Sequence, residues 1–71
     1  MRYFLSYVVQ QMDERKFRAH LCGTDKIVDC YLSYELFRNN TPVFVGDLIR
    51  LEYNDGLRRI KKRFYYIIEV I

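Results

Sequence analysis

A run of basic residues near the C-terminus is the part of the sequence best suited to chemistry with a partner. The segment between Leu57 and Phe64 has no acidic residue, and its five basic residues are Arg58, Arg59, Lys61, Lys62 and Arg63. Guanidinium and ammonium groups bind phosphates, and exposed tyrosine rings beside them stack on bases. The alternative is a solvated sheet face whose charges prevent edge pairing. The run therefore indicates either a nucleic-acid contact or a protective charged face.

The dipeptide Asp55-Gly56 predicts how a hairpin would display this run. Glycine supplies the positive φ that a two-residue type I′ turn needs. Apolar residues occupy odd positions before the turn and even positions after it, so a two-residue loop pairs Leu51 with Ile60 and Arg50 with Lys61. The candidate partner-binding residues on the resulting basic-aromatic face are Arg50, Arg58, Arg59, Lys61, Arg63 and Tyr65.

A second group of reactive residue types lies in the middle of the chain. Alternation over residues 17–22 and 28–36 predicts a hairpin that pairs His20 with Asp29 and places Cys22 on the same face. Such a trio could form a nucleophilic site. However, His20 and Cys22 lie two residues apart on one strand, which is a poor geometry for proton transfer. The sequence also lacks paired acids and a phosphate-binding loop, so we expect no catalytic residue, no cofactor and no enzyme activity.

The two cysteines, Cys22 and Cys30, do not form a metal motif. Their spacing is not Cys-x-x-Cys and the chain has one histidine, so a four-ligand zinc site is not expected. The predicted hairpin puts the two thiols on opposite faces, which excludes an intrachain disulfide. The apolar run Tyr3–Val9 is too short to span a membrane. We therefore expect a cytoplasmic protein with free thiols and no membrane partner.

The 71 residues predict one small domain, residues 1–71, that is rich enough in apolar side chains (51%) to fold. Strands are expected over residues 2–11, 17–22 and 28–36, and in both arms of the C-terminal hairpin. A helix within residues 25–39 is the alternative to the third strand. Asp47 after Gly46 is expected to fix a turn through its side chain. Five strands with short connections predict an all-β, small five-stranded antiparallel barrel of the OB, SH3 or PUA-like kind, with room for one short helix.

The first strand has apolar residues on both faces. Phe4 and Val8 share one face, and the other carries Tyr3, Leu5, Tyr7 and Val9. Such a strand is either covered on both sides or lies in an interface, so homo-oligomerisation is a possible outcome.

Residues from Tyr34 onward, Glu-Leu-Phe-Arg-Asn-Asn-Thr-Pro followed by Val-Phe-Val-Gly-Asp, resemble the barrel segment of ASCH-type domains in the PUA-like superfamily. The resemblance covers about half of the chain and implies a β-barrel that binds RNA or a nucleotide-like ligand. The Gly-x-Lys motif of that family is absent, and two residues separate Glu35 from Arg38 instead of one. No enzyme residues are therefore carried over.

The distribution of charge agrees with a binding role. Net charge is +3, and the excess lies in residues 36–71, which hold seven basic and four acidic residues. A local positive field can steer an anionic partner. The expected function is a non-enzymatic module that binds single-stranded DNA or RNA through the basic-aromatic face. The alternative is a protein-binding adaptor or inhibitor, for example a phage or plasmid accessory factor, or a self-associating barrel.

Overall fold

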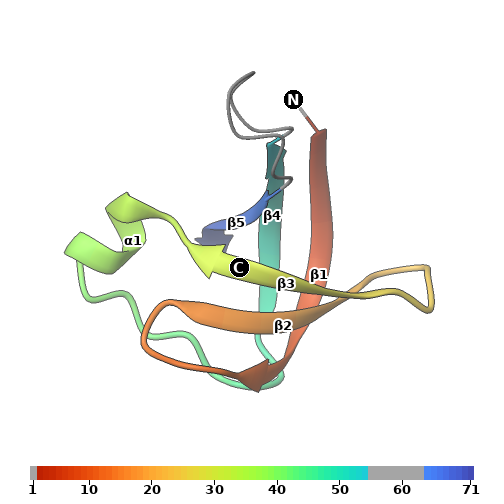
Figure 1. The fold of residues 1–71 in the computed structure, drawn as a ribbon, viewed down its shortest axis with the longest axis horizontal. Coiled ribbons are helices and arrows are strands. Elements are labelled where there is room, and N and C mark those ends of the chain that lie inside the picture. Colours follow the sequence, from red (N-terminus) through yellow and green to blue (C-terminus); the bar gives the residue numbers. More distant parts are fainter. Residues whose placement is uncertain (1, 55–63) are drawn as a thin grey trace.

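The computed structural model describes residues 2–54 and 64–71. Its elements in chain order are β1 (Arg2–Gln11), β2 (Lys16–Leu21), β3 (Ile27–Leu32), α1 (Tyr34–Arg38), β4 (Leu48–Asn54) and β5 (Phe64–Val70). The strands close into a barrel in the order β1-β2-β3-β5-β4 (Figure 1). The prediction of a small five-stranded barrel with one short helix is confirmed. Four of the strand pairings are antiparallel, and the pairing of β3 with β5 is parallel.

Alternation along β1 decides which side chains fill the barrel. Ser6 and Val8 are buried, whereas the residues between and around them point outward. The core they join includes Ile49, Leu51 and Ile67, which have no exposed surface. The other buried apolar residues are Phe17, Ala19, Leu21, Cys30, Leu32 and Val43. Both sheet faces of β1 are therefore apolar, but only one is covered by the barrel.

The β2–β3 hairpin has the predicted faces but a different register. Cys30 is buried and Cys22 exposed, as expected. Arg18 pairs with Asp29 and His20 with Ile27, so the predicted pair of His20 with Asp29 is wrong. The turn starts one residue earlier than expected, because Leu21 N–H already donates to the carbonyl of Lys26. A shift by two residues preserves which side chains face inward, and this is why alternation alone could not detect it.

Residues 25–39 contain both of the structures that the sequence left open. The strand β3 ends at Leu32, and the Ser33 hydroxyl then accepts a hydrogen bond from Leu36 N–H as the N-cap of α1. The helix ends at Arg38 with Asn39 as its C-cap, and Asn40 takes a positive φ of 53°. The expected strand over residues 28–36 is thus cut short by a helix cap.

The first arm of the C-terminal hairpin, β4, begins at Leu48, because residues 44–47 form a turn before it. The Asp47 carboxylate accepts a hydrogen bond from Phe44 N–H at 2.9 Å, which confirms the predicted role of this side chain. Gly46 has a φ of 95°, a conformation that glycine adopts without steric cost.

The register predicted for the C-terminal hairpin is also wrong. Leu51 pairs with Ile67, not with Ile60, and Arg50 pairs with Glu69, not with Lys61. Asn54 pairs with Phe64, so the two strands are joined by residues 55–63, and the predicted turn at Asp55-Gly56 lies outside the described residues. The physical reason is that β5 must pair with β3 as well as β4, which places Ile67 in the core.

Within the described residues, no helix is long and apolar enough to cross a membrane.

Candidate functional site

Three aromatic side chains form a surface where β3 meets β5, which we call the aromatic platform: Tyr31, Phe64 and Tyr66. Tyr31 is the parallel neighbour of Tyr66. The ring of Phe64 lies 5.7 Å from that of Tyr31 in an edge-on arrangement and 6.1 Å from that of Tyr66. All three are half-buried. Rings at these separations support one another while leaving part of their surface open to a ligand.

The turn between β1 and β2 borders this platform. Its residues Asp13, Glu14 and Arg15 line a shallow hollow of about 570 Å³ together with the three platform residues. The Asp13 carboxylate accepts hydrogen bonds from the backbone N–H groups of Arg15 and Lys16, both at 2.8 Å. These two bonds lower the pKa of Asp13. The capped turn therefore holds one wall of the hollow in place.

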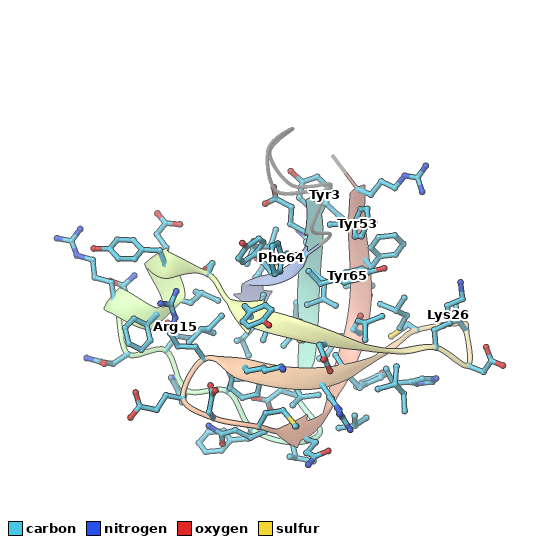
Figure 2. The ribbon with its side chains drawn as sticks, viewed as in Figure 1. Tyr3, Arg15, Lys26, Tyr53, Phe64 and Tyr65 are labelled. Carbon is cyan, nitrogen blue, oxygen red and sulfur yellow. The ribbon has the colours of Figure 1, made fainter. Side chains whose placement is uncertain are left out.

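Two cations, one in this turn and one at the start of β2, lie over aromatic rings. The guanidinium carbon of Arg15 is 4.7 Å from the centroid of the Phe37 ring, on α1. The Lys16 Nζ atom is 5.9 Å from the centroid of Tyr31. Figure 2 shows Arg15 and Phe64 on the same side of the barrel, with Lys26 at the far end of the β2–β3 hairpin. Cations beside aromatic rings combine attraction for phosphate with surfaces on which a base can stack.

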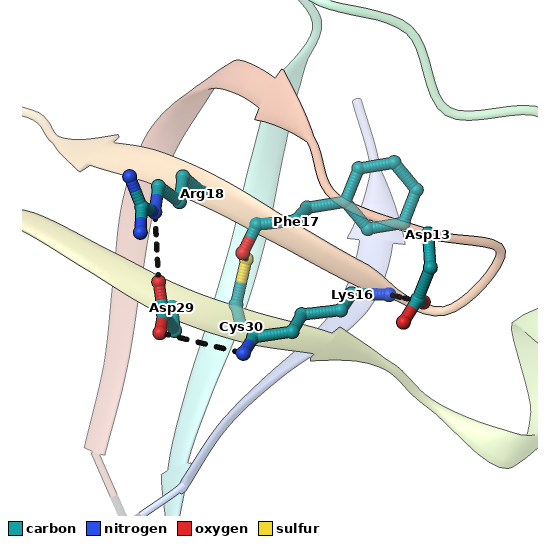
Figure 3. Close-up of polar contacts among 6 residues, drawn as sticks. All are labelled: Asp13, Lys16, Phe17, Arg18, Asp29 and Cys30. Carbon is teal, nitrogen blue, oxygen red and sulfur yellow. Dashed lines mark hydrogen bonds and ion pairs between the residues drawn. The ribbon is translucent and has the colours of Figure 1, made fainter.

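Asp29 neutralises part of this positive charge. Its carboxylate lies 3.2 Å from Nε of Arg18 and 3.8 Å from Nζ of Lys16 (Figure 3). These side chains are between one third and one half exposed. The pairs therefore contribute little to stability, and an anionic ligand can compete for the two cations. Asp29 lies opposite Arg18, whereas the sequence had placed it opposite His20.

The sequence-predicted site residues do not all lie together. Arg50 is on the outer face of β4, where its Nη1 atom lies 3.2 Å from Oε1 of Glu69. Tyr65 packs against the barrel core, and its ring lies 4.8 Å from Tyr53 and 6.0 Å from Phe4. The remaining four lie outside the described residues: Arg58, Arg59, Lys61 and Arg63.

Sequence reasoning missed Phe64 and Tyr66 as surface residues because it assumed the wrong register. A two-residue turn assigned them to the interior and Tyr65 to the surface, and the observed register reverses this. Tyr31 was correctly placed on the outer face, but nothing in its spacing linked it to Phe64. The missing signal was the parallel pairing of β3 with β5, which brings residues far apart in sequence side by side.

The described residues offer no site for metal chemistry, since no group of three His, Cys, Asp or Glu side chains is close enough to hold an ion. The Cys30 thiol is buried, donates to the carbonyl of Phe17 at 3.5 Å, and has its pKa raised to about 12 by burial. A thiol with so high a pKa is a poor nucleophile. The comparisons found no matching protein family, no matching curated protein and no matching solved structure. The resemblance to ASCH-type domains stays a prediction.

Proposed function

We propose that this chain is an OB-like, non-enzymatic module that binds single-stranded DNA or RNA on the aromatic platform. The carrying observation is the cluster of Tyr31, Phe64 and Tyr66 beside the cations Arg15, of the β1–β2 turn, and Lys16, of β2. Base stacking on such rings contributes about 1–3 kcal/mol per base and tolerates any sequence. The free thiols Cys22 and Cys30 fit a reducing, cytoplasmic setting.

The position of the platform supports an OB-like assignment. OB folds are five-stranded Greek-key barrels that bind oligonucleotides on strands 2 and 3 and on the 1–2 and 4–5 connections. Here Tyr31 is on β3, Lys16 and Arg18 are on β2, and Arg15 is in the β1–β2 connection. The strand order also crosses over, because β3 neighbours β5 instead of β4.

The cations around the platform are matched by nearby acids, so the basic run between Leu57 and Phe64 is part of the proposed site. Among the described residues there, the cations Arg15, Lys16 and Arg18 are matched by acids of the same turn and by Asp29. The excess positive charge lies instead in the sequence immediately before Phe64. We therefore assign phosphate attraction to Arg58, Arg59, Lys61 and Arg63, and base stacking to the platform. Arg50 and Tyr65 leave the proposed site.

The test is a fluorescence anisotropy titration of labelled single-stranded DNA and RNA at two salt concentrations. Changing Tyr31 and Tyr66 to Ala should weaken binding about 5- to 150-fold, which corresponds to the loss of one stacked base. Changing Phe44, an exposed aromatic residue outside the platform, to Ala serves as the matched control. Equal loss in the control, or no binding by the wild type at micromolar protein in low salt, would reject the proposal.

The basic run makes a separate prediction in the same assay. Each phosphate contact to a single strand contributes about −0.7 to the slope of log affinity against log salt. Changing Arg59, Lys61 and Arg63 together to Ala should therefore make the slope shallower by about 2. Lys26, exposed at the far end of the β2–β3 hairpin (Figure 2), is the control because its removal should leave the slope unchanged.

A further inference from the structure

The outer face of β1 carries an apolar surface that the barrel leaves uncovered. Its side chains alternate with those that enter the core, and we call them the β1 stripe: Tyr3, Leu5, Tyr7 and Val9. They are 56%, 45%, 47% and 41% exposed, respectively. Side chains two apart on a strand are about 7 Å from one another, so the stripe is continuous along about 20 Å. Four large apolar side chains in one row exceed the scattered exposure that a soluble surface normally shows.

The residues beside the stripe shape it as an interface. On β4, Leu48 and Arg50 are the cross-strand neighbours of Tyr7 and Leu5. Tyr3, Arg50 and Ile68 line a shallow hollow of about 450 Å³. An apolar row with a hollow next to it is able to accept a projecting side chain from a partner, and aromatic residues and arginine are the types enriched at such sites.

We propose that the β1 stripe is a self-association surface on which a second copy of this chain docks about a two-fold axis. The described charges beside the stripe argue for this partner. Arg50 and Glu69 form a 3.2 Å ion pair, and Glu52 is the cross-strand neighbour of Tyr3, so the border of the stripe carries charges of both signs. Because an isologous interface must be complementary to itself, a border with charges of both signs allows Arg50 of one copy to meet an acid of the other.

The available area also suits a dimer. A tyrosine can bury about 150–250 Å², so the two half-exposed tyrosines of the stripe offer about 200 Å² together. Leu5, Val9 and the flanking residues of β4 extend this toward the roughly 800 Å² per partner of a standard interface. The stripe supplies the apolar centre, and Arg50 and Glu69 belong to the polar rim.

The barrel order places this surface away from the aromatic platform. In the closed order β1-β2-β3-β5-β4, both β3 and β5 are two strands away from β1. Figure 1 likewise shows α1 on the opposite side of the barrel from β1. A dimer formed through the stripe therefore leaves both platforms free. If the proposed function also holds, the dimer is bivalent and gains avidity on long strands.

The test measures molar mass by light scattering coupled to size exclusion, over a range of micromolar concentrations. The wild type should have about twice the 8.7 kDa mass of one chain. In Leu5→Glu, the new carboxylate can pair with Arg50 in the monomer but places two acids at the dimer centre, so the mass should fall to that of one chain. Tyr7→Thr keeps strand propensity and should weaken dimerisation roughly tenfold or more, as removal of an interface aromatic does.

The matched control is Tyr34→Glu, which places the same charge on an exposed aromatic position of α1. It should leave the dimer intact. Circular dichroism of each variant establishes that it is folded. A wild type that stays at one-chain mass, or a dimer that survives both β1 substitutions in folded protein, would overturn the proposal and leave the stripe to a different protein.

Cys22 gives a second readout without any substitution. Its N–H donates to the carbonyl of Leu5 at 2.9 Å, so the exposed thiol lies at the edge of the stripe. Its rate of reaction with a thiol reagent should fall as protein concentration rises, and Leu5→Glu should abolish that dependence. A rate that is independent of concentration in the wild type would contradict the dimer. The buried Cys30 is the unreactive internal reference.

Discussion

The β1 stripe and the aromatic platform are both partly exposed apolar surfaces on one small barrel, but their chemical surroundings differ. The stripe mixes tyrosine with aliphatic side chains, and its neighbouring charges Arg50 and Glu69 neutralise each other. The platform is wholly aromatic, and cations approach it from the β1–β2 turn. The stripe suits a neutral protein partner, whereas the platform suits planar bases attached to phosphates.

Exposure of aromatic residues does not by itself show which kind of partner a surface binds. Tyr7 and Tyr31 are both tyrosines of outward-facing strand positions. The difference lies in what stands opposite them: Tyr7 faces Leu48 and His20 across the strands, and Tyr31 faces Lys16 and Tyr66. Each surface can therefore be altered without altering the other.

The largest effect on stability is expected from a substitution of the core residue Ile67, because the core supports both surfaces. Ile67 has no exposed surface and lies between Leu51 on β4 and Leu32 on β3. Changing it to Ala should lower the free energy of unfolding by about 2–5 kcal/mol. Ile68, the next residue, lines the outer hollow, so Ile68→Ala is the matched control and should cost much less in urea denaturation. Equal costs would contradict the observed register of β5.

The next prediction tests whether self-association and oligonucleotide binding depend on different surfaces. Leu5→Glu should abolish self-association and leave the affinity for a short oligonucleotide that spans one platform within about twofold, since the sites lie apart and their effects are independent. Tyr31→Ala should do the opposite, with a loss of about 1–3 kcal/mol in binding and an unchanged dimer. Anisotropy and light scattering on the same samples provide the measurement. Loss of both properties in either folded variant would show that the surfaces are one.

A smaller effect concerns the inner face of β1. The Ser6 side chain is fully buried and its hydroxyl has no hydrogen-bond partner among the described residues. A buried hydroxyl without a partner destabilises the folded state by about 1–3 kcal/mol. Ser6→Ala removes this cost and loses a small amount of packing, so the free energy of unfolding should rise by roughly 1 kcal/mol. Because the change is internal, the dissociation constant of the dimer should not move. Destabilisation in urea would indicate that the hydroxyl is satisfied.

The smallest effect is the pH dependence of the turn beside the platform. The folded state lowers the pKa of Asp13 below 3.8 because its carboxylate accepts the N–H groups of Arg15 and Lys16. The carboxylate therefore stabilises the fold above the unfolded pKa, and this contribution is lost as pH falls through the folded value. Thermal melts between about pH 6 and about pH 2 should show a weaker acid dependence in Asp13→Asn than in Glu14→Gln. An equal dependence of the melting temperature on pH in the two variants would contradict this role of Asp13.

Much of the fold could be predicted from the sequence, because alternation reports which face of a strand is apolar. It correctly separated Cys30 from Cys22, and it identified both faces of β1. Alternation cannot report register, since a shift by two residues changes no face. It also fails at irregularities such as the register shift between Arg50 and Leu51, where the relation between odd and even positions changes.

The candidate site was harder to predict for the same reason. The platform joins a residue of β3 to residues of β5, and this pairing depends on the crossover in strand order. In the sequence, Phe64, Tyr65 and Tyr66 have nearly the same chemical character, so only the register decides which ring faces the core. The basic run was recognised from composition alone, since charge density needs no knowledge of register.

The most direct test of the central claim is the titration of labelled single-stranded nucleic acid with the wild-type chain and with the Tyr31, Tyr66 double alanine variant at low and high salt. Saturable binding by the wild type that weakens with salt, and a loss of about 1–3 kcal/mol in the variant at both salt concentrations, is the predicted result. Wild-type protein that leaves the anisotropy of the strand unchanged at low salt, or a folded variant that binds as tightly as the wild type, would contradict it.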